Sequence, residues 1–275
     1  MRNTVVLVLV DGLNHATARE CMGALQGLCE AGKACLYPVQ CELPALSRPL
    51  YECILTGKTP VQSGVTHNGH ARMSREQSIF HYARAAGLTT AAAAYQWVSE
   101  LYNRTPFDPA RDRHVSDPNL LIQHAHFYFL DRYPDCHLFA DAESLRRRHH
   151  PHFLLVHSMA VDHAGHLQGA DSALYRNSAR EADALLAEYL PGWLDDGCQV
   201  LVTADHGMNA DMTHNGLLPE ERTVPLYTIG ERFSLDPAAR PLQIEICGTI
   251  CELLGVEHDK CVCVELIKTF PSQSS

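Results

Sequence analysis

Six short apolar runs separated by helical segments constrain the fold more than any other feature of this sequence. The runs are nearly continuous in apolar residues, which is typical of strands covered on both faces, as in a parallel sheet. They lie at residues 5–10, 34–39, 89–94, 153–157, 200–203 and 224–229. Helical patterns occupy residues 78–86, 171–190 and 244–254, and Pro191-Gly192 is expected to end the longest of them. The alternation predicts an α/β fold, with a doubly wound, mostly parallel sheet and helices on both faces.

Residues from about 103 to 150 interrupt this alternation. The stretch "RTPFDPARDRHVSDPN" is rich in Pro, Asp and Arg, which favours irregular structure. We therefore expect one domain over residues 1–275, with a small cap-like excursion from the sheet at about 103–150. The basic run "RRRHHPH" at 146–152 is interpreted as a solvated helix end rather than a phosphate site.

Charge and cysteine content exclude several classes of protein. The formal net charge of −10 argues against a general binder of nucleic acid or of an anionic membrane. The apolar runs are too short to span a bilayer, and the first of them lacks a signal-peptide cleavage site. The 11 cysteines form no repeating frame, so we expect reduced thiols and a cytoplasmic protein. Cys261 and Cys263 are interpreted as alternating positions of a tail strand rather than as metal ligands.

Acidic residues and imidazoles follow three of the expected strands at the point where each strand ends. In open α/β sheets ligands bind beyond the carboxyl ends of the strands, so these side chains should meet at one edge. The three acids are Asp11, Asp162 and Asp205, and the three imidazoles are His166, His206 and His214. Six such ligands are too many for one zinc, which usually takes four. They suit two divalent ions sharing a pocket, and nitrogen and oxygen ligands favour Zn, with Mn as the alternative.

Ser47 is the candidate to work with these ions. It follows the second expected strand and precedes a helical pattern that ends at Gly57. As an N-cap it would lie at the positive end of the helix dipole, where an alkoxide or an anion is favoured. Ser followed by Arg48 and Pro49 is also typical of an ordinary helix cap.

Four blocks of the sequence resemble the alkaline phosphatase superfamily, in its nucleotide pyrophosphatase/phosphodiesterase branch, which also holds phosphonoacetate hydrolase. They are "VLVDGLN" (8–14), "PALSRPLYECILTGKTPVQSGV" (44–65), "DHAGH" (162–166) and "ADHGM" (204–208) with His214 beyond. The resemblance implies an alkaline-phosphatase-like fold and a two-metal hydrolase of phosphate monoesters or diesters. It implies one ion on Asp162, His166 and His214. It implies a second ion on Asp11, Ser47, Asp205 and His206, with Ser47 as the catalytic nucleophile that forms a phosphoryl-enzyme.

The charges of this implied site sum to zero. Three carboxylates and one alkoxide carry −4, and two divalent ions carry +4. An anionic phosphoryl group would therefore not be repelled on entry. The implied partner is a small phosphorylated or phosphonate substrate, with no nucleic acid polymer and no membrane, and the oligomeric state is not defined.

Three positions are candidates for substrate contacts. Leu50 stands where phosphodiesterases of this branch usually have Asn, which predicts poor discrimination among nucleotide bases. Arg48 predicts a compact substrate with a second anionic group. Tyr95 could stack on a substrate, although packing is the better interpretation. The alternative functions are a phosphonate (C–P) hydrolase, a phosphomutase of the same superfamily, and a non-catalytic metal-binding domain.

Overall fold

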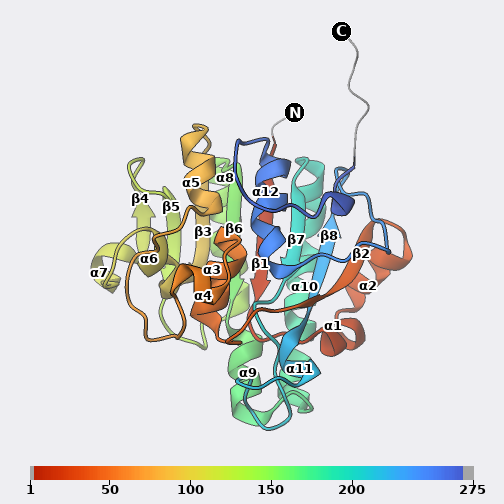
Figure 1. The fold of residues 1–275 in the computed structure, drawn as a ribbon. Coiled ribbons are helices and arrows are strands. Elements are labelled where there is room, and N and C mark those ends of the chain that lie inside the picture. Colours follow the sequence, from red (N-terminus) through yellow and green to blue (C-terminus); the bar gives the residue numbers. More distant parts are fainter. Residues whose placement is uncertain (1–2, 269–275) are drawn as a thin grey trace.

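The structure is a computed structural model, and it describes residues 3–268. All named strands belong to one eight-stranded sheet with the order β2-β8-β7-β1-β6-β3-β5-β4 (Figure 1). The strands are β1 (Val5–Val10), β2 (Ala34–Gln40), β3 (Thr90–Tyr95), β4 (His114–Ser116), β5 (His124–Tyr128), β6 (Phe153–Ser158), β7 (Gln199–Thr203) and β8 (Thr223–Ile229). The five central strands, from β7 to β5, pair in parallel, and β8, β2 and β4 join by antiparallel pairing. The expected α/β fold with a mostly parallel sheet is confirmed.

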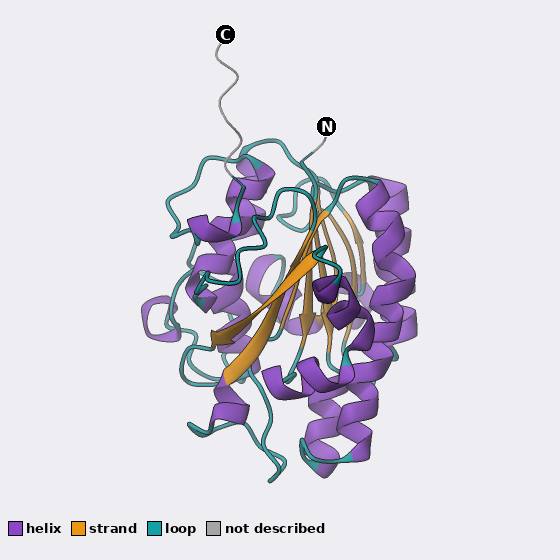
Figure 2. Cartoon of the chain, turned by 90° about the vertical axis from the view of Figure 1, so that its right-hand side faces the viewer, coloured by secondary structure: helices purple, strands orange, loops and turns teal. Residues whose placement is uncertain are grey.

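Helices cover both faces of the twisted sheet (Figure 2). The helices of the first half of the chain are α1 (His15–Cys21), α2 (Gly23–Glu30), α3 (Ser47–Thr56), α4 (Pro60–Ser63), α5 (Ile79–Ala85), α6 (Gln96–Tyr102) and α7 (Pro109–Asp112). Those of the second half are α8 (Asp135–His149), α9 (Ala160–Gln168), α10 (Ala173–Asp195), α11 (Pro219–Arg222) and α12 (Ile246–Leu254), with 3₁₀ turns at Gln243–Glu245 and Val264–Leu266. No helix within residues 3–268 is long and apolar enough to cross a membrane.

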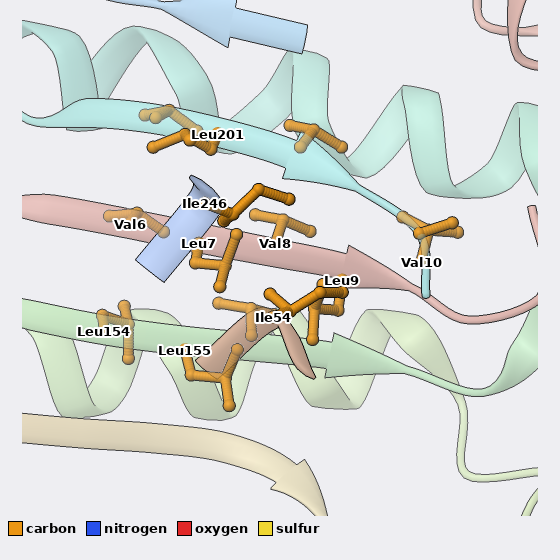
Figure 3. Packing of buried hydrophobic residues seen from close by; sticks show 14 of the residues in the cluster. Val6, Leu7, Val8, Leu9, Val10, Ile54, Leu154, Leu155, Leu201 and Ile246 are labelled. Atoms are coloured by element: carbon orange, nitrogen blue, oxygen red, sulfur yellow. The ribbon is translucent and has the colours of Figure 1, made fainter. Parts of the chain in front are cut away.

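The core is centred on β1, which is buried along its whole length. Its side chains lie between those of β6 and β7, with Ile54 of α3 and Ile246 of α12 packed over the sheet (Figure 3). Because β1 is covered on both faces, it contains no polar side chain. The burial of Ile54 also fixes α3 against the sheet, and this helix begins at Ser47.

Residues 103–150, expected to be a cap-like excursion, include two strands at one end of the sheet and a helix that covers it. β5 pairs with β3, β4 pairs with β5, and α8 packs against β3 and β6. In β5, buried Ala125 and Phe127 alternate with the partly exposed His124 and His126. Alternation is normal for a strand with one face open to water.

Two other expectations differ from the structure. Helix α10 continues through Pro191 to Asp195. A proline inside a helix costs about 3 kcal/mol, but Leu190 and Trp193 are buried beside it. Burying a large apolar side chain contributes roughly 1.5–3 kcal/mol, so the two together offset that cost. Cys261 and Cys263 lie in irregular chain before a 3₁₀ turn, not in a strand.

Candidate metal centre

Three strand ends bring the predicted acids to one edge of the sheet. The register aligns Val5 of β1 with the first residues of both β6 and β7, so the three strands end at nearly the same level. Asp11 directly follows β1, Asp205 lies two residues beyond β7, and Asp162 lies in the first turn of α9 after β6. All three carboxylates are buried.

Gly12 allows the loops that carry these acids to approach one another. Its φ of +72° is in the left-handed region, and a Cβ there would lie 2.8 Å from the Cα of Asp162. Its backbone N–H donates a hydrogen bond to Oδ1 of Asp205 at 3.3 Å. Any other residue would strain the backbone and push Asp162 away from Asp11 and Asp205.

The three predicted imidazoles share one orientation. Each has its Nδ1 within hydrogen-bond distance of a backbone carbonyl: His206 with Gly207 at 2.9 Å, His214 with Ala45 at 2.6 Å, and His166 with Met212 at 3.0 Å. A carbonyl only accepts, so Nδ1 carries the proton in each ring and Nε2 of the neutral ring carries a lone pair.

His206 directs its Nε2 at two acids. The nitrogen lies 3.2 Å from Oδ2 of Asp205 and 3.5 Å from Oδ1 of Asp11. Neither oxygen accepts a hydrogen bond, although both are buried. Buried acceptors are rarely left unpaired, and lone pairs that face each other at this distance repel unless a proton or a metal cation lies between them. The arrangement fits a metal ion.

Asp162 forms a second group with two imidazoles. Its Oδ1, which is also buried without a hydrogen-bond donor, lies 3.4 Å from Nε2 of His166 and 3.9 Å from Nε2 of His214. The rings of His206 and His214 stack with their centroids 3.7 Å apart, so the two groups are neighbours.

Two sets of three residues have ligand atoms that all lie within 4.8 Å of one another. The first set is Asp11, Asp205 and His206, and the second is Asp162, His206 and His214. His166, which the resemblance implies as a ligand of the second set, borders that set with a side chain that is 45% exposed.

Burial sets the protonation of these groups. It raises the pKa of Asp11 and of Asp162 well above the usual value, with repulsion between the carboxylates adding to the effect, and raises the pKa of Asp205 to about 6. It lowers the pKa of His206 and His214 to about 3. Each shift opposes charge on a buried group. A divalent cation would reverse this preference for the carboxylates, because it stabilises their anionic form.

Ser47 lies beside His206, with its Oγ 3.0 Å from Nε2. The expectation that Ser47 caps α3 is wrong by one residue: the N-cap is Leu46, and Ser47 is the first residue of the helix. Its hydroxyl therefore makes no cap hydrogen bond and remains at the site. The N-terminus of α3 still points its dipole toward the hydroxyl.

The residues predicted to contact substrate are engaged within the fold. The guanidinium of Arg48 pairs with Glu100 at 2.5 Å, lies 4.9 Å from the ring centroid of Trp97, and has a side chain only 3% exposed. Leu50 packs in a small apolar cluster and is fully buried. The hydroxyl of Tyr95 donates to Asp131 at 2.9 Å, and its ring packs edge-on against Trp97. The substrate role of Arg48 conflicts with this buried pair.

Two residues that the sequence analysis did not select contact Asp11. Tyr51 donates its hydroxyl to Oδ2 of Asp11, and Nε2 of His157 lies 3.2 Å from the same oxygen. His157 interrupts the apolar strand β6, which was a visible signal of a buried polar contact. Tyr51 lies four residues after Ser47, on the same face of α3, but its partner could not be read from the sequence.

An open, mostly parallel sheet with acid and imidazole groups beyond its strand ends is the architecture of the alkaline phosphatase superfamily. The model of the type I phosphodiesterase/nucleotide pyrophosphatase family matches residues 5–229. The chain belongs to this family, whose members are phosphodiesterases and pyrophosphatases.

Curated relatives cover the chain with low identity. The catalytic subunit of GPI ethanolamine phosphate transferase 2 from Homo sapiens is 23% identical over 280 residues, which is 93% of this chain and 27% of the relative. GPI ethanolamine phosphate transferase 2 from Schizosaccharomyces pombe is 27% identical over 128 residues, 39% of this chain and 17% of the relative. The chain spans about a quarter of the human relative.

Solved structures share the fold. Human ectonucleotide pyrophosphatase/phosphodiesterase 5 superposes with a TM-score of 0.71 at 12% identity, over 97% of this chain and all of that chain. The zinc complex of the periplasmic domain of EcEptC from Escherichia coli gives 0.63 at 14% identity, over 93% and 83% of the two chains. The phosphonate monoester hydrolase of Silicibacter pomeroyi gives 0.63 at 14% identity, over 99% and 78%.

Proposed function

We propose that this chain cleaves phosphate esters by attack of Ser47 on phosphorus, with two divalent ions held by the carboxylates and imidazoles at the strand ends. One observation carries the proposal. Three imidazoles, each fixed by a backbone carbonyl, direct lone pairs at buried carboxylate oxygens that accept no hydrogen bond. A set of oriented nitrogen and oxygen donors without protons between them is suited to cations.

The ligands divide between the two ions as the family resemblance implies. Asp11, Asp205 and His206 would hold one ion together with Ser47, and Asp162, His166 and His214 would hold the other. The nitrogen and oxygen donors favour Zn, with Mn as the alternative, and a neighbour in fold was solved with zinc. The ions would supply positive charge that favours the alkoxide of Ser47 and stabilises the phosphoryl oxygens.

His206 and the N-terminus of α3 orient the hydroxyl of Ser47. Because Nδ1–H of His206 donates to Gly207, Nε2 carries the one lone pair of the ring, and before an ion binds this lone pair accepts from the Ser47 hydroxyl at 3.0 Å. With an ion bound, the lone pair would coordinate that ion beside Oγ instead. The hydrogen bond orients Oγ at the N-terminus of α3, where the dipole favours negative charge. The buried position keeps competing water away from the hydroxyl.

The reaction then has two balanced steps. Oγ of Ser47 forms a bond to phosphorus as its proton leaves, and the bond from phosphorus to the ester oxygen breaks, with that oxygen taking a proton as it departs. Water then forms a bond to phosphorus, the bond between phosphorus and Oγ breaks, and Ser47 regains its proton. The substrate class is a small phosphate mono- or diester.

A pair of serine variants tests the nucleophile. We expect Ser47→Ala to keep the fold and to lose at least about a thousandfold in turnover of aryl phosphate esters. Ser47→Thr retains a hydroxyl and should keep measurable activity. Acid quench of the wild type with substrate, followed by peptide mapping, should find phosphorus on Ser47. An adduct on another residue would assign the attack to that residue, and full turnover by Ser47→Ala without an adduct would assign it to water.

Transfer to an alcohol is a second candidate, because the curated relatives are ethanolamine phosphate transferases. The first step is the same, and an alcohol then replaces water in the second. Product analysis with a phosphodiester donor, in water and with added primary alcohols, separates the two. With a transferase, the ratio of new diester to hydrolysis product should be far above the ratio of alcohol to water in the reaction. A hydrolase should release only the phosphate monoester.

A further inference from the structure

We propose that Tyr51 and His157 are positioning residues that set the carboxylate of Asp11 for metal binding. The inference rests on the proposed metal centre and adds two residues to it. Both side chains are completely buried and both reach the same carboxylate oxygen, Oδ2 of Asp11. His157 belongs to neither of the two sets of clustered ligand atoms found among the described residues.

The backbone fixes His157 as a donor. The N–H of Tyr95, at the end of β3, donates to Nδ1 of His157 at 3.3 Å. Nδ1 therefore carries a lone pair, and the proton of the neutral ring lies on Nε2. That proton points at Oδ2 of Asp11, 3.2 Å from Nε2. The imidazole acts as a hydrogen-bond donor toward the acid and is not arranged as a ligand.

Tyr51 supplies the second donor to the same oxygen. Its hydroxyl donates to Oδ2 of Asp11, and the ring packs edge-on against His157 with a centroid separation of 4.6 Å. Two donors hold the carboxylate in one rotamer and satisfy Oδ2. Oδ1 accepts no hydrogen bond and lies 3.5 Å from Nε2 of His206. Oδ1 is thus the oxygen that remains for a cation.

The same contact couples the nucleophile to the acid. Tyr51 lies one helical turn after Ser47 on α3, so both side chains project from the same face of the helix. A shift of α3 would therefore move the hydroxyl of Ser47 and, at the same time, weaken the hydrogen bond from Tyr51 to Asp11. Hydrogen-bond partners of metal ligands commonly change metal affinity by 10–100-fold when they are removed.

A matched pair of tyrosine variants tests the role. Tyr51→Phe keeps the ring and removes the hydroxyl. Tyr102→Phe makes the same change at another buried tyrosine, which donates to Glu52 at 2.6 Å and contacts no predicted ligand. The readout is Zn²⁺ affinity from competition with a chromogenic chelator. We expect Tyr51→Phe to bind one of its two ions about 10–100-fold more weakly, and Tyr102→Phe to bind both as the wild type does.

Variants of His157 give an independent readout. Gln can place an amide N–H near the position of Nε2, so His157→Gln should retain more Zn²⁺ affinity than His157→Leu. Wild-type affinity in Tyr51→Phe, or equal loss in the Gln and Leu variants, would overturn the inference. If the wild-type chain binds no Zn²⁺, the proposed metal centre itself fails, and the two failures are distinguishable.

Discussion

At the scale of single residues, the proposed metal centre depends on which nitrogen of each imidazole carries the proton. Backbone carbonyls hold Nδ1–H of His166, His206 and His214, so all three present Nε2 to the acids. The carbonyl groups belong to Met212, Gly207 and Ala45. Because the main chain sets the orientation, it persists when a side chain nearby is changed. Substitution of one ligand should therefore affect its own ion more than the other.

We predict that His214→Ala and Asp205→Ala weaken different ions. His214 lies 3.9 Å from Asp162, whereas Asp205 lies 3.2 Å from His206. Zn²⁺ titration should show one tight ion remaining in each variant and neither in the double variant. His163→Ala is the control, because His163 lines a separate cavity beside α9. If both single variants lost the same ion, a single site centred on His206 would replace the two-ion account.

The sequence selected the candidate ligands but not the residues that form hydrogen bonds with them. Asp11, Asp205 and His206 each stand at a strand end, and position alone selected them. Tyr51 could not be selected, because its contact with Asp11 depends on how α3 packs against β1. Arg48 was assigned to substrate because its buried partner, Glu100, lies on another helix, 52 residues along the chain.

At the scale of elements, α3 carries the proposed nucleophile and is held by a buried ion pair. Arg48 of α3 pairs with Glu100 of α6, and its guanidinium also donates to the carbonyl of His70 at 2.9 Å. The backbone N–H of Phe107 donates to the other oxygen of Glu100 at 3.1 Å. The pair thus connects the helix start beside Ser47 to two loops. Strands β4 and β5, at one end of the sheet, were not among the expected strands, because neither contains a continuous apolar run.

We predict that Arg48→Ala destabilises the fold by about 3–5 kcal/mol, because it leaves the buried carboxylate of Glu100 without its cationic partner. Arg147→Ala is the control. Arg147 pairs with Glu143 at the surface with a side chain 74% exposed, and such pairs contribute about 0–1 kcal/mol. Urea unfolding measures both. Wild-type stability of Arg48→Ala, combined with a higher KM for anionic esters, would instead support the substrate contact that the sequence suggested.

At the scale of the whole molecule, one sheet brings together residues from position 11 to position 214. Parallel strands in matched register make this possible, since their carboxyl ends form one edge. The alternating pattern was enough to predict this sheet, because the central strands are buried on both faces and read as apolar runs. All 11 cysteines are free thiols, and the cytoplasmic location stays a prediction.

We propose that two divalent ions occupy this edge of the sheet in the active protein. The most direct measurement is the metal content of purified chain that turns over an aryl phosphate ester, determined by mass spectrometry after removal of loosely bound ions. We expect about two ions of Zn or Mn per chain. Activity should be lost when a chelator removes the ions and restored when Zn²⁺ or Mn²⁺ is added back. Full turnover by a chain that holds one ion or none would contradict this proposal.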